Sequence, residues 1–257
     1  MDYLKINKEA WNNRTDVHVE SAFYDVSSFK AGKCSLNPIE LTQVGDVKGK
    51  SLLHLQCHFG QDTLSWARLG AKVTGVDLSS AAINKAKELN DALQLDAAFI
   101  ESDVYAFGEE NEQSFDIVYT SYGVLCWLPD LDKWAQTIHD ALKVGGEFHL
   151  VEFHPFNDLL SGYAYFSKAE PDIEDEGTYT ENCDGNLQTM VTWTHAVSDV
   201  ISALIRVGLA IEVFKEYEHS PYECFEGLEK VEGEGFKKTI KKQSIPIVYS
   251  IKAIKKQ

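Results

Sequence analysis

Asp77 follows a short apolar segment, and a turn that contains Gly60 precedes it by one helix and one strand. Such a turn places free backbone N–H groups at the start of a helix. A carboxylate at the end of the next strand can accept hydrogen bonds from both hydroxyls of a ribose. Asp77 lies 21 residues after Gln56, close to the ~20 expected of a ribose-binding acid. These residues therefore predict a site for a nucleoside.

The segment around this acid is predicted to form a strand, a tight turn, a helix and a second strand. Leu52, Leu53 and Leu55 form an apolar run typical of a buried parallel strand. The helix runs from 62 to 70 and the second strand from 72 to 76. Further strands are expected at 96–101, 115–120, 147–153, 211–214 and 247–251, with helices up to 89, at 129–142 and at 197–207. This alternation predicts an α/β fold with a doubly wound sheet.

We expect residues 1–257 to form one domain, because no linker divides the chain. Within it we distinguish an N-terminal cap (1–45), a core (46–155), an insertion (156–190) and a C-terminal helix with strands (191–257). The cap has two interpretations that its composition does not separate. It is either a lid whose aromatic residues close over the strand ends, or a cover for an edge of the sheet.

Composition and charge limit the class of protein and its partners. Hydrophobic residues make up 44% of the chain, which is ordinary for a globular protein. No apolar run reaches the ~20 residues of a membrane span, and the N-terminus lacks the apolar core of a signal peptide, so we expect a cytoplasmic protein without a membrane partner. The five widely spaced cysteines are expected to be reduced. The net charge of −16 argues against nucleic acid as a partner, and the oligomeric state stays open.

Five segments carry a resemblance to a known family. In chain order they read LLHLQCHFGQD, VTGVDLS, ESDVYAF, FDIVYTSYGVLCWLPDL and LKVGGEFHLVEFHP. Over about residues 50–155 this order resembles the class I S-adenosylmethionine-dependent methyltransferases. The phrase NKEAWNNRTDVHVESAFYDV is similar to an uncharacterised bacterial branch that acts on small molecules. The resemblance implies a seven-stranded, mostly parallel sheet, S-adenosyl-L-methionine as cofactor, and methyl transfer to a small-molecule acceptor.

The resemblance also implies roles for individual residues. The cofactor would contact the turn after the first strand and the residues after strands two to four, namely Gln56, Cys57, His58, Gly60, Asp77, Leu78, Asp103, Val104 and Ser121. The resemblance puts Tyr122 at the methyl-transfer site. From their positions in the chain, Trp127 and His154 are further candidates for contact with the acceptor, as is Tyr24 if the N-terminal segment is a lid. If the acceptor must lose a proton, the candidates for the base are His154, Tyr122 and His18.

The turn departs from the acid-x-Gly-x-Gly-x-Gly pattern of the family. His54, Gln56 and His58 stand where the acid and the first two glycines would be, and only Gly60 remains. Since glycine permits close backbone approach, the Gln and the His either narrow the pocket or add contacts of their own. His54 and His58 are four residues apart, but on a strand and its turn they need not converge, so no metal site is expected.

Three of the candidates also have a purely structural interpretation. Asp77 could cap the following helix, and Asp103 could belong to a turn. His154 could satisfy a neighbouring backbone carbonyl group. The sequence leaves these alternatives open.

The acceptor and the type of reaction also have alternatives. Trp127, Tyr163, Tyr165 and the acidic residues of the insertion favour a small cationic or amine-bearing acceptor. A nicotinamide-dependent oxidoreductase would share the strand, the turn, the helix and the ribose acid, although no Tyr-x-x-x-Lys motif is present. A catalytically inactive nucleoside-binding relative is a third possibility, since a fold does not decide activity.

Overall fold

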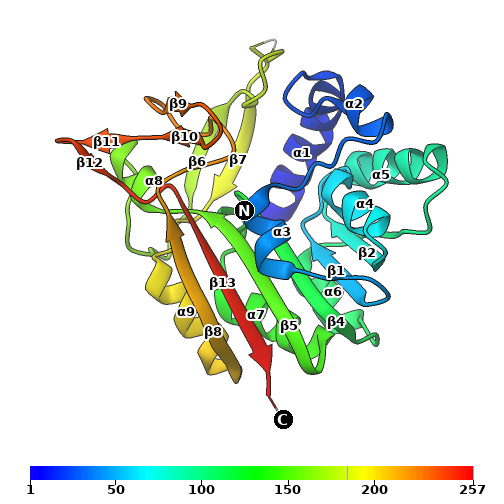
Figure 1. Cartoon of the computed structure of the whole chain (residues 1–257). Coiled ribbons are helices and arrows are strands. Elements are labelled where there is room, and N and C mark those ends of the chain that lie inside the picture. The colour runs from blue at the N-terminus through cyan, green and yellow to red at the C-terminus, as the bar shows by residue number, and fades with distance from the viewer. Residues whose placement is uncertain (184, 257) are drawn as a thin grey trace.

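A seven-stranded sheet lies at the centre of the molecule (Figure 1). The computed structural model describes residues 1–183 and 185–256. The sheet order is β3 (Ala98–Glu101), β2 (Lys72–Asp77), β1 (Ser51–Leu55), β4 (Phe115–Ser121), β5 (Leu142–Phe153), β13 (Val248–Lys255) and β8 (Leu209–Tyr217). Strands β1 to β5 pair in parallel, whereas β13 is antiparallel to both β5 and β8. The predicted mostly parallel, doubly wound sheet is confirmed.

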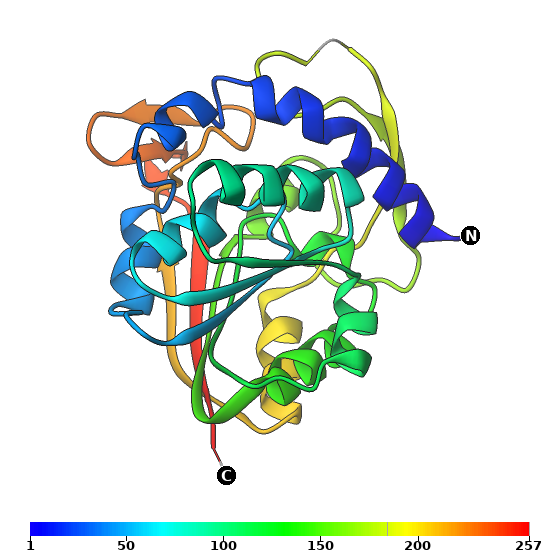
Figure 2. The same cartoon turned by 90° about the vertical axis from the view of Figure 1, so that its right-hand side faces the viewer.

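Helices cover both faces of the sheet (Figure 2). One face carries α3 (Pro38–Val44), α4 (Gln61–Arg68) and α5 (Ser80–Ala92), and the other carries α6 (Val104–Glu110), α7 (Leu131–Ala141) and α9 (Val197–Arg206). Successive strand residues point to opposite faces. In β1, Leu52 accordingly packs in the cluster of Trp66 from α4, while Leu53 packs in the cluster of Trp134 from α7. Burial on both sides explains the continuous apolar run in this strand.

Two helices differ most from the predicted pattern. The sequence from Asn7 to Arg14 looks helical, and helix α1 (Tyr3–Glu20) extends beyond it at both ends. The Asp2 side chain caps the first turn of α1. Helix α6 has no counterpart among the predicted elements, because a segment of seven residues is too short to show helical periodicity. The Asp103 carboxylate caps α6 by accepting hydrogen bonds from the N–H groups of Tyr105 and Ala106.

The N-terminal segment and the insertion lie together at the carboxyl ends of the parallel strands (Figures 1 and 2). The insertion contains α8 (Phe156–Leu160) and the antiparallel pair β6 (Asp172–Glu176) and β7 (Gln188–Thr192). Helix α1 packs against both α5 and β7. The side-chain amide of Asn7 is buried and bonds both the N–H and the carbonyl of Val191 in β7. Helix α1 therefore lies over the carboxyl ends of the strands, held there by α5 and by the insertion.

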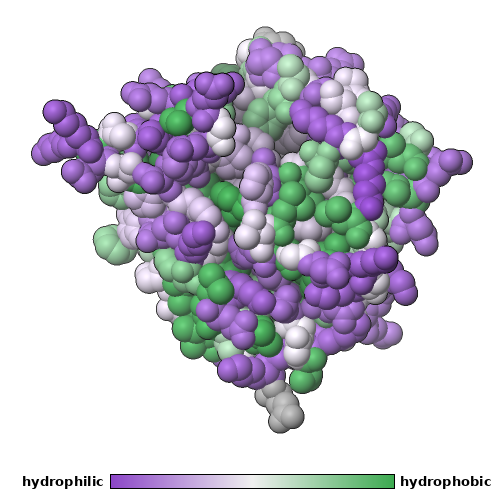
Figure 3. Space-filling model, in the orientation of Figure 1, coloured by the Kyte–Doolittle hydropathy of each residue, from purple (hydrophilic) through white to green (hydrophobic). Residues whose placement is uncertain are grey.

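Short elements complete the chain. They are α2 (Val26–Lys30), the 3-10 helix η1 (Leu125–Trp127), and the strand pairs β9 (Glu229–Val231) with β10 (Gly235–Lys237) and β11 (Thr239–Ile240) with β12 (Gln243–Ser244). Hydrophilic side chains cover much of the surface seen in Figure 3, as the charge of the chain leads one to expect. Within the described residues, no helix is both long enough and apolar enough to cross a lipid bilayer.

Candidate active site

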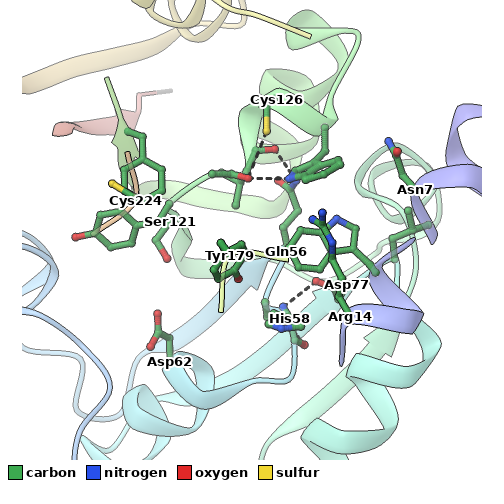
Figure 4. Close-up of a pocket in the computed structure, with 18 of the residues that line it drawn as sticks. Asn7, Arg14, Gln56, His58, Asp62, Asp77, Ser121, Cys126, Tyr179 and Cys224 are labelled. Carbon is green, nitrogen blue, oxygen red and sulfur yellow. Dashed lines mark hydrogen bonds between the residues drawn. The ribbon is translucent and has the colours of Figure 1, made fainter. Parts of the chain in front are cut away.

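A cavity of about 780 Å³ opens at the carboxyl ends of the parallel strands. The loops after β1, β2, β3 and β4 form its floor, while α1 and the insertion form its roof (Figure 4). Binding sites for small molecules have volumes of roughly 300–1,000 Å³. The cavity therefore has the size and the place in the sheet that a small ligand needs.

The loop after β1 keeps the backbone conformation of a glycine-rich turn without its glycines. Gln56 has φ 57°, His58 has φ 50° and Gly60 has φ 81°, all in the left-handed region. Glycine adopts this conformation readily and other residues rarely do. At Gly60 no larger residue fits, because a Cβ would lie 2.8 Å from the Phe99 ring. The backbone path is thus retained although two of the three glycine positions have changed.

The side chains of Gln56 and His58 turn toward protein partners and leave the cavity open. Gln56 Nε2 donates to the carbonyl of Val124 at 2.8 Å. His58 Nε2 lies 2.8 Å from His18 Nδ1 on α1. Both residues still line the cavity. Gln56 and His58 therefore add hydrogen bonds of their own at the two positions where glycine was expected. The alternative was that their side chains narrow the pocket.

Asp77 ends β2 and lines the cavity between the β1 loop and α5. One carboxylate oxygen accepts the N–H of His58 and the other accepts the N–H of Ser79, each at 2.8 Å. The cap of α5 is Ser79, so Asp77 is not the helix cap. A carboxylate has about four acceptor sites, so two of them remain for a ligand. Burial raises the pKa of Asp77 to about 6.

Asp103 serves as a helix cap and as a wall of the cavity. Its carboxylate caps α6, which is the structural interpretation of this residue. It also lines the cavity with Leu78 and Val104, at the end that lies beyond Asp77. The two interpretations of Asp103 are therefore compatible.

The loop after β4 brings Ser121, Tyr122 and Trp127 to the cavity. The Tyr122 hydroxyl is buried, and burial together with the nearby Glu40 carboxyl raises the pKa of Tyr122 well above its usual value. A hydroxyl in this environment does not readily serve as a base. The Trp127 indole N–H donates to the carbonyl of Gly123 at 2.8 Å, which fixes the ring as a wall of the cavity.

The structure does not bring His154 to the cavity. Its Nε2 lies 3.0 Å from a Glu216 carboxylate oxygen, and its Nδ1 accepts the N–H of Phe156 at 3.1 Å. Both ring nitrogens are thus used within the fold, beside the sheet and away from the residues that line the cavity. His154 is therefore not among the residues that line the cavity, whereas its chain neighbour Phe153 is. His18 is not among the residues that line the cavity, but it contacts two that are, His58 and Tyr179.

His54 and His58 bond different partners. His54 Nδ1 lies 2.8 Å from the Thr63 hydroxyl, whereas His58 faces α1. In residues 1–183 and 185–256, no group of three or more His, Cys, Asp or Glu side chains is arranged to hold a metal ion.

A family model described as a methyltransferase domain matches residues 53–148. An uncharacterised methyltransferase from Synechocystis sp. is 33% identical over 131 residues, which cover 50% of this chain and 59% of that protein. A ubiquinone biosynthesis O-methyltransferase from Shewanella pealeana is 29% identical over 133 residues, which cover 50% of this chain and 55% of that protein. The chain therefore spans little more than half the length of these two relatives.

A solved structure shows the same fold over nearly the whole chain. The S-adenosylmethionine-dependent methyltransferase from Mesorhizobium loti superposes with a TM-score of 0.56 at 19% identity, covering 88% of this chain and 99% of that one. Residues 53–148 of this chain match a methyltransferase domain, and the fold over most of the chain is that of an S-adenosylmethionine-dependent methyltransferase. The resemblance noted in its sequence motifs is confirmed.

The roof of the cavity holds residues that the motif comparison missed. On α1 these are Tyr3, Asn7, Trp11 and Arg14, and on the insertion they include Asp158, Glu174, Glu176 and Tyr179. The α1 residues are spaced three or four apart and so share one helix face, a signal that the sequence carries. The insertion residues had no such signal. Arg14 is 6% exposed, and its guanidinium donates to the carbonyl of Gly177.

Proposed function

We propose that this chain transfers a methyl group from S-adenosyl-L-methionine to a small-molecule acceptor. The observation that carries the proposal is the Asp77 carboxylate, which lines the cavity beside a β1 loop of left-handed conformation. Each oxygen of Asp77 uses one acceptor site within the protein, so each keeps one for a ribose hydroxyl. The donor set of this cavity thus fits a nucleoside cofactor.

The resemblance and the residues that line the cavity support one placement of the cofactor. Asp77 would hold the ribose, and the backbone of the β1 loop, from Gln56 through Cys57 and His58 to Gly60, would hold the amino-acid part. Leu78, Asp103 and Val104 would surround the adenine, and Ser121 would lie near the reacting methyl group. When bound, the cofactor supplies a methyl group on a sulfonium centre. The chain's own contribution is to align the acceptor and to exclude water, and alignment of this kind can lower a barrier by about 7–11 kcal/mol.

The rest of the cavity favours an acceptor that carries an amine. Trp127 and Tyr163 line it, whereas Tyr165 does not. Asp158 and Glu174 lie on the same side, and the Tyr163 hydroxyl donates to Glu174 at 2.5 Å. Carboxylates and aromatic faces both attract a cationic amine. The proposed acceptor is therefore a small amine bound under the insertion, next to Trp127.

Two measurements test this proposal. Isothermal titration of the protein with S-adenosylhomocysteine should show binding, and titration with NADH should show none. Incubation with S-adenosylmethionine and a panel of small amines, phenols and carboxylic acids should release S-adenosylhomocysteine only with amines. Binding of NADH in place of S-adenosylhomocysteine would favour an oxidoreductase. Tight S-adenosylhomocysteine binding without turnover of any acceptor would indicate an inactive relative.

A further inference from the structure

The guanidinium group of Arg14 is a buried cation in the roof of the cavity. Arg14 lies on α1, is 6% exposed and lines the cavity. Figure 4 shows its side chain extending from α1 on the side of the cavity that holds His58 and Asp77, away from Asp62. A guanidinium group stays charged in proteins, and a buried charge is costly unless it is paired. The position of Arg14 therefore calls for an anionic partner.

The described part of the protein gives this cation a carbonyl group but no carboxylate partner. Nη2 of Arg14 donates to the carbonyl oxygen of Gly177 in the insertion at 2.6 Å. Glu176 lines the same cavity and attracts the guanidinium group, but the two side chains form no ion pair in residues 1–183 and 185–256. Over the same residues Arg14 forms none with Asp16, which lines a smaller adjoining hollow of about 310 Å³. The N–H groups of Nη1 therefore remain for a ligand.

The other charged residues of the cavity direct an anion to Arg14. Lys33 is the second cationic side chain among the described lining residues, and it is already paired with Asp25 at 3.3 Å. Carboxyl groups occupy much of the remaining wall, namely those of Asp62, Asp77, Asp103, Asp158, Asp172, Glu174, Glu176 and Glu223. Like charges repel more strongly in a buried site than in water. A ligand that carries a carboxylate therefore places it most favourably beside Arg14.

The β1 loop next to Arg14 has few N–H groups left for a carboxylate. Those of Cys57, His58 and Gly60 already donate to acceptors within the protein. The guanidinium carbon of Arg14 lies 5.6 Å from the centre of the Trp11 ring, and the centre of that ring lies 5.2 Å from that of the His58 ring. Arg14 thus brings additional hydrogen-bond donors to the side of the loop that faces α1.

We propose that Arg14 binds the carboxylate of the cofactor's amino-acid part. The inference rests on the proposed function, which places that part at the β1 loop. The fork of N–H groups on a guanidinium matches the two oxygens of a carboxylate. Because the same guanidinium donates to Gly177, the bound carboxylate also ties α1 to the insertion and holds the roof over the cofactor.

The test compares two ligands that differ by this carboxylate alone. S-adenosylhomocysteine carries it, and 5′-deoxy-5′-(3-aminopropylthio)adenosine is the same molecule without it. In isothermal titration the wild type should prefer S-adenosylhomocysteine by about tenfold or more, as expected for a hydrogen bond between charged groups. Arg14→Met should bind the two ligands with affinities within threefold of each other. Arg14→Lys, which keeps the charge but not the fork, should retain part of the preference.

The matched control is Lys33→Met, because Lys33 lines the cavity but is paired with Asp25. This variant should keep the ligand preference of the wild type. If Arg14 had a structural role only, Arg14→Met would weaken both ligands equally and keep the preference, and that result would overturn the inference alone. Equal binding of both ligands by the wild type would do the same, whether or not a variant folds. Failure of the wild type to bind S-adenosylhomocysteine would overturn the proposed function as well.

Discussion

Replacement of Asp77 by asparagine separates the ligand-binding role of this residue from its structural one. The carboxylate accepts two backbone N–H groups, from His58 and Ser79, and asparagine has only one oxygen to accept them. A buried N–H without an acceptor costs about 1–3 kcal/mol. Against this, the rise of the Asp77 pKa from 3.8 to about 6 means that burial disfavours the charged form by about 3 kcal/mol. Asp77→Asn removes that penalty, so we expect the free energy of unfolding to change by less than about 2 kcal/mol.

Binding should respond much more strongly than stability. A hydrogen bond to a charged group contributes about 1.5–3 kcal/mol, and asparagine keeps one neutral acceptor where the ribose would meet two charged ones. We expect a loss of about 2–3 kcal/mol, which corresponds to a roughly 30- to 150-fold weaker affinity for S-adenosylhomocysteine. Isothermal titration at pH 7.5 measures the affinity, and thermal unfolding without ligand measures the stability.

A second buried carboxyl of the same cavity provides the control. Asp158 lines the cavity on the side assigned to the acceptor, and burial raises its pKa to about 7. Asp158→Asn should leave the affinity for S-adenosylhomocysteine within threefold of the wild type. An affinity of Asp77→Asn that is within twofold of the wild type would refute the assignment of the ribose to Asp77. Equal losses in both variants would show a general effect of charge.

Four further predictions follow from the same contacts. Because the folded pKa of Asp77 is raised to about 6, its carboxylate takes up a proton as the pH falls through this value, and titration calorimetry should show S-adenosylhomocysteine affinity decreasing below pH 6 while it is constant above pH 7. Glu152→Gln should lower the unfolding free energy by about 2–3 kcal/mol in denaturant titrations, because the buried carboxylate accepts the N–H groups of the loop 123–125. Gly60→Ala should lower it by more than about 2 kcal/mol, since the added Cβ would lie 2.8 Å from Phe99 at φ 81°. His154→Gln should leave turnover of any accepted substrate unchanged, because His154 lies outside the cavity, and a drop in kcat of more than tenfold would contradict this placement.

The sheet could be predicted from the sequence because each strand has a signal of its own. The segments 52–55 and FDIVYT are buried on both faces, so apolar residues predominate in both and do not simply alternate with polar ones. The acids at the strand ends could be placed by counting along the chain, and Asp77 and Asp103 both line the cavity. Local patterns thus reveal those parts of the site that belong to the sheet itself.

The N-terminal segment and the acidic insertion could be placed near the site from their composition, but the contacts that join them could not be predicted, because they link distant segments of the chain. Arg14 bonds Gly177, and the hydroxyl of Tyr24 bonds that of Tyr179, across more than 150 positions of the chain. No periodic pattern links these residues, since one partner lies in an irregular insertion. The contacts of His154 could not be predicted either. Its position after β5 suggested a base, but the side chain turns toward Glu216 on the neighbouring part of the sheet.

The β1 loop shows which property of a glycine-rich turn this chain retains. A left-handed conformation costs a residue other than glycine roughly 1–2 kcal/mol, and Gln56 and His58 both adopt it. Hydrogen bonds from Gln56 to Val124 and from His58 to His18 offset that cost, since each is worth about 0.5–1.5 kcal/mol. The conformation also lets the His58 N–H point at Asp77, which holds the carboxylate in place. The chain therefore keeps the backbone conformation of the turn. In addition, the side chains of Gln56 and His58 bond the β4 loop and α1, contacts that glycine could not make.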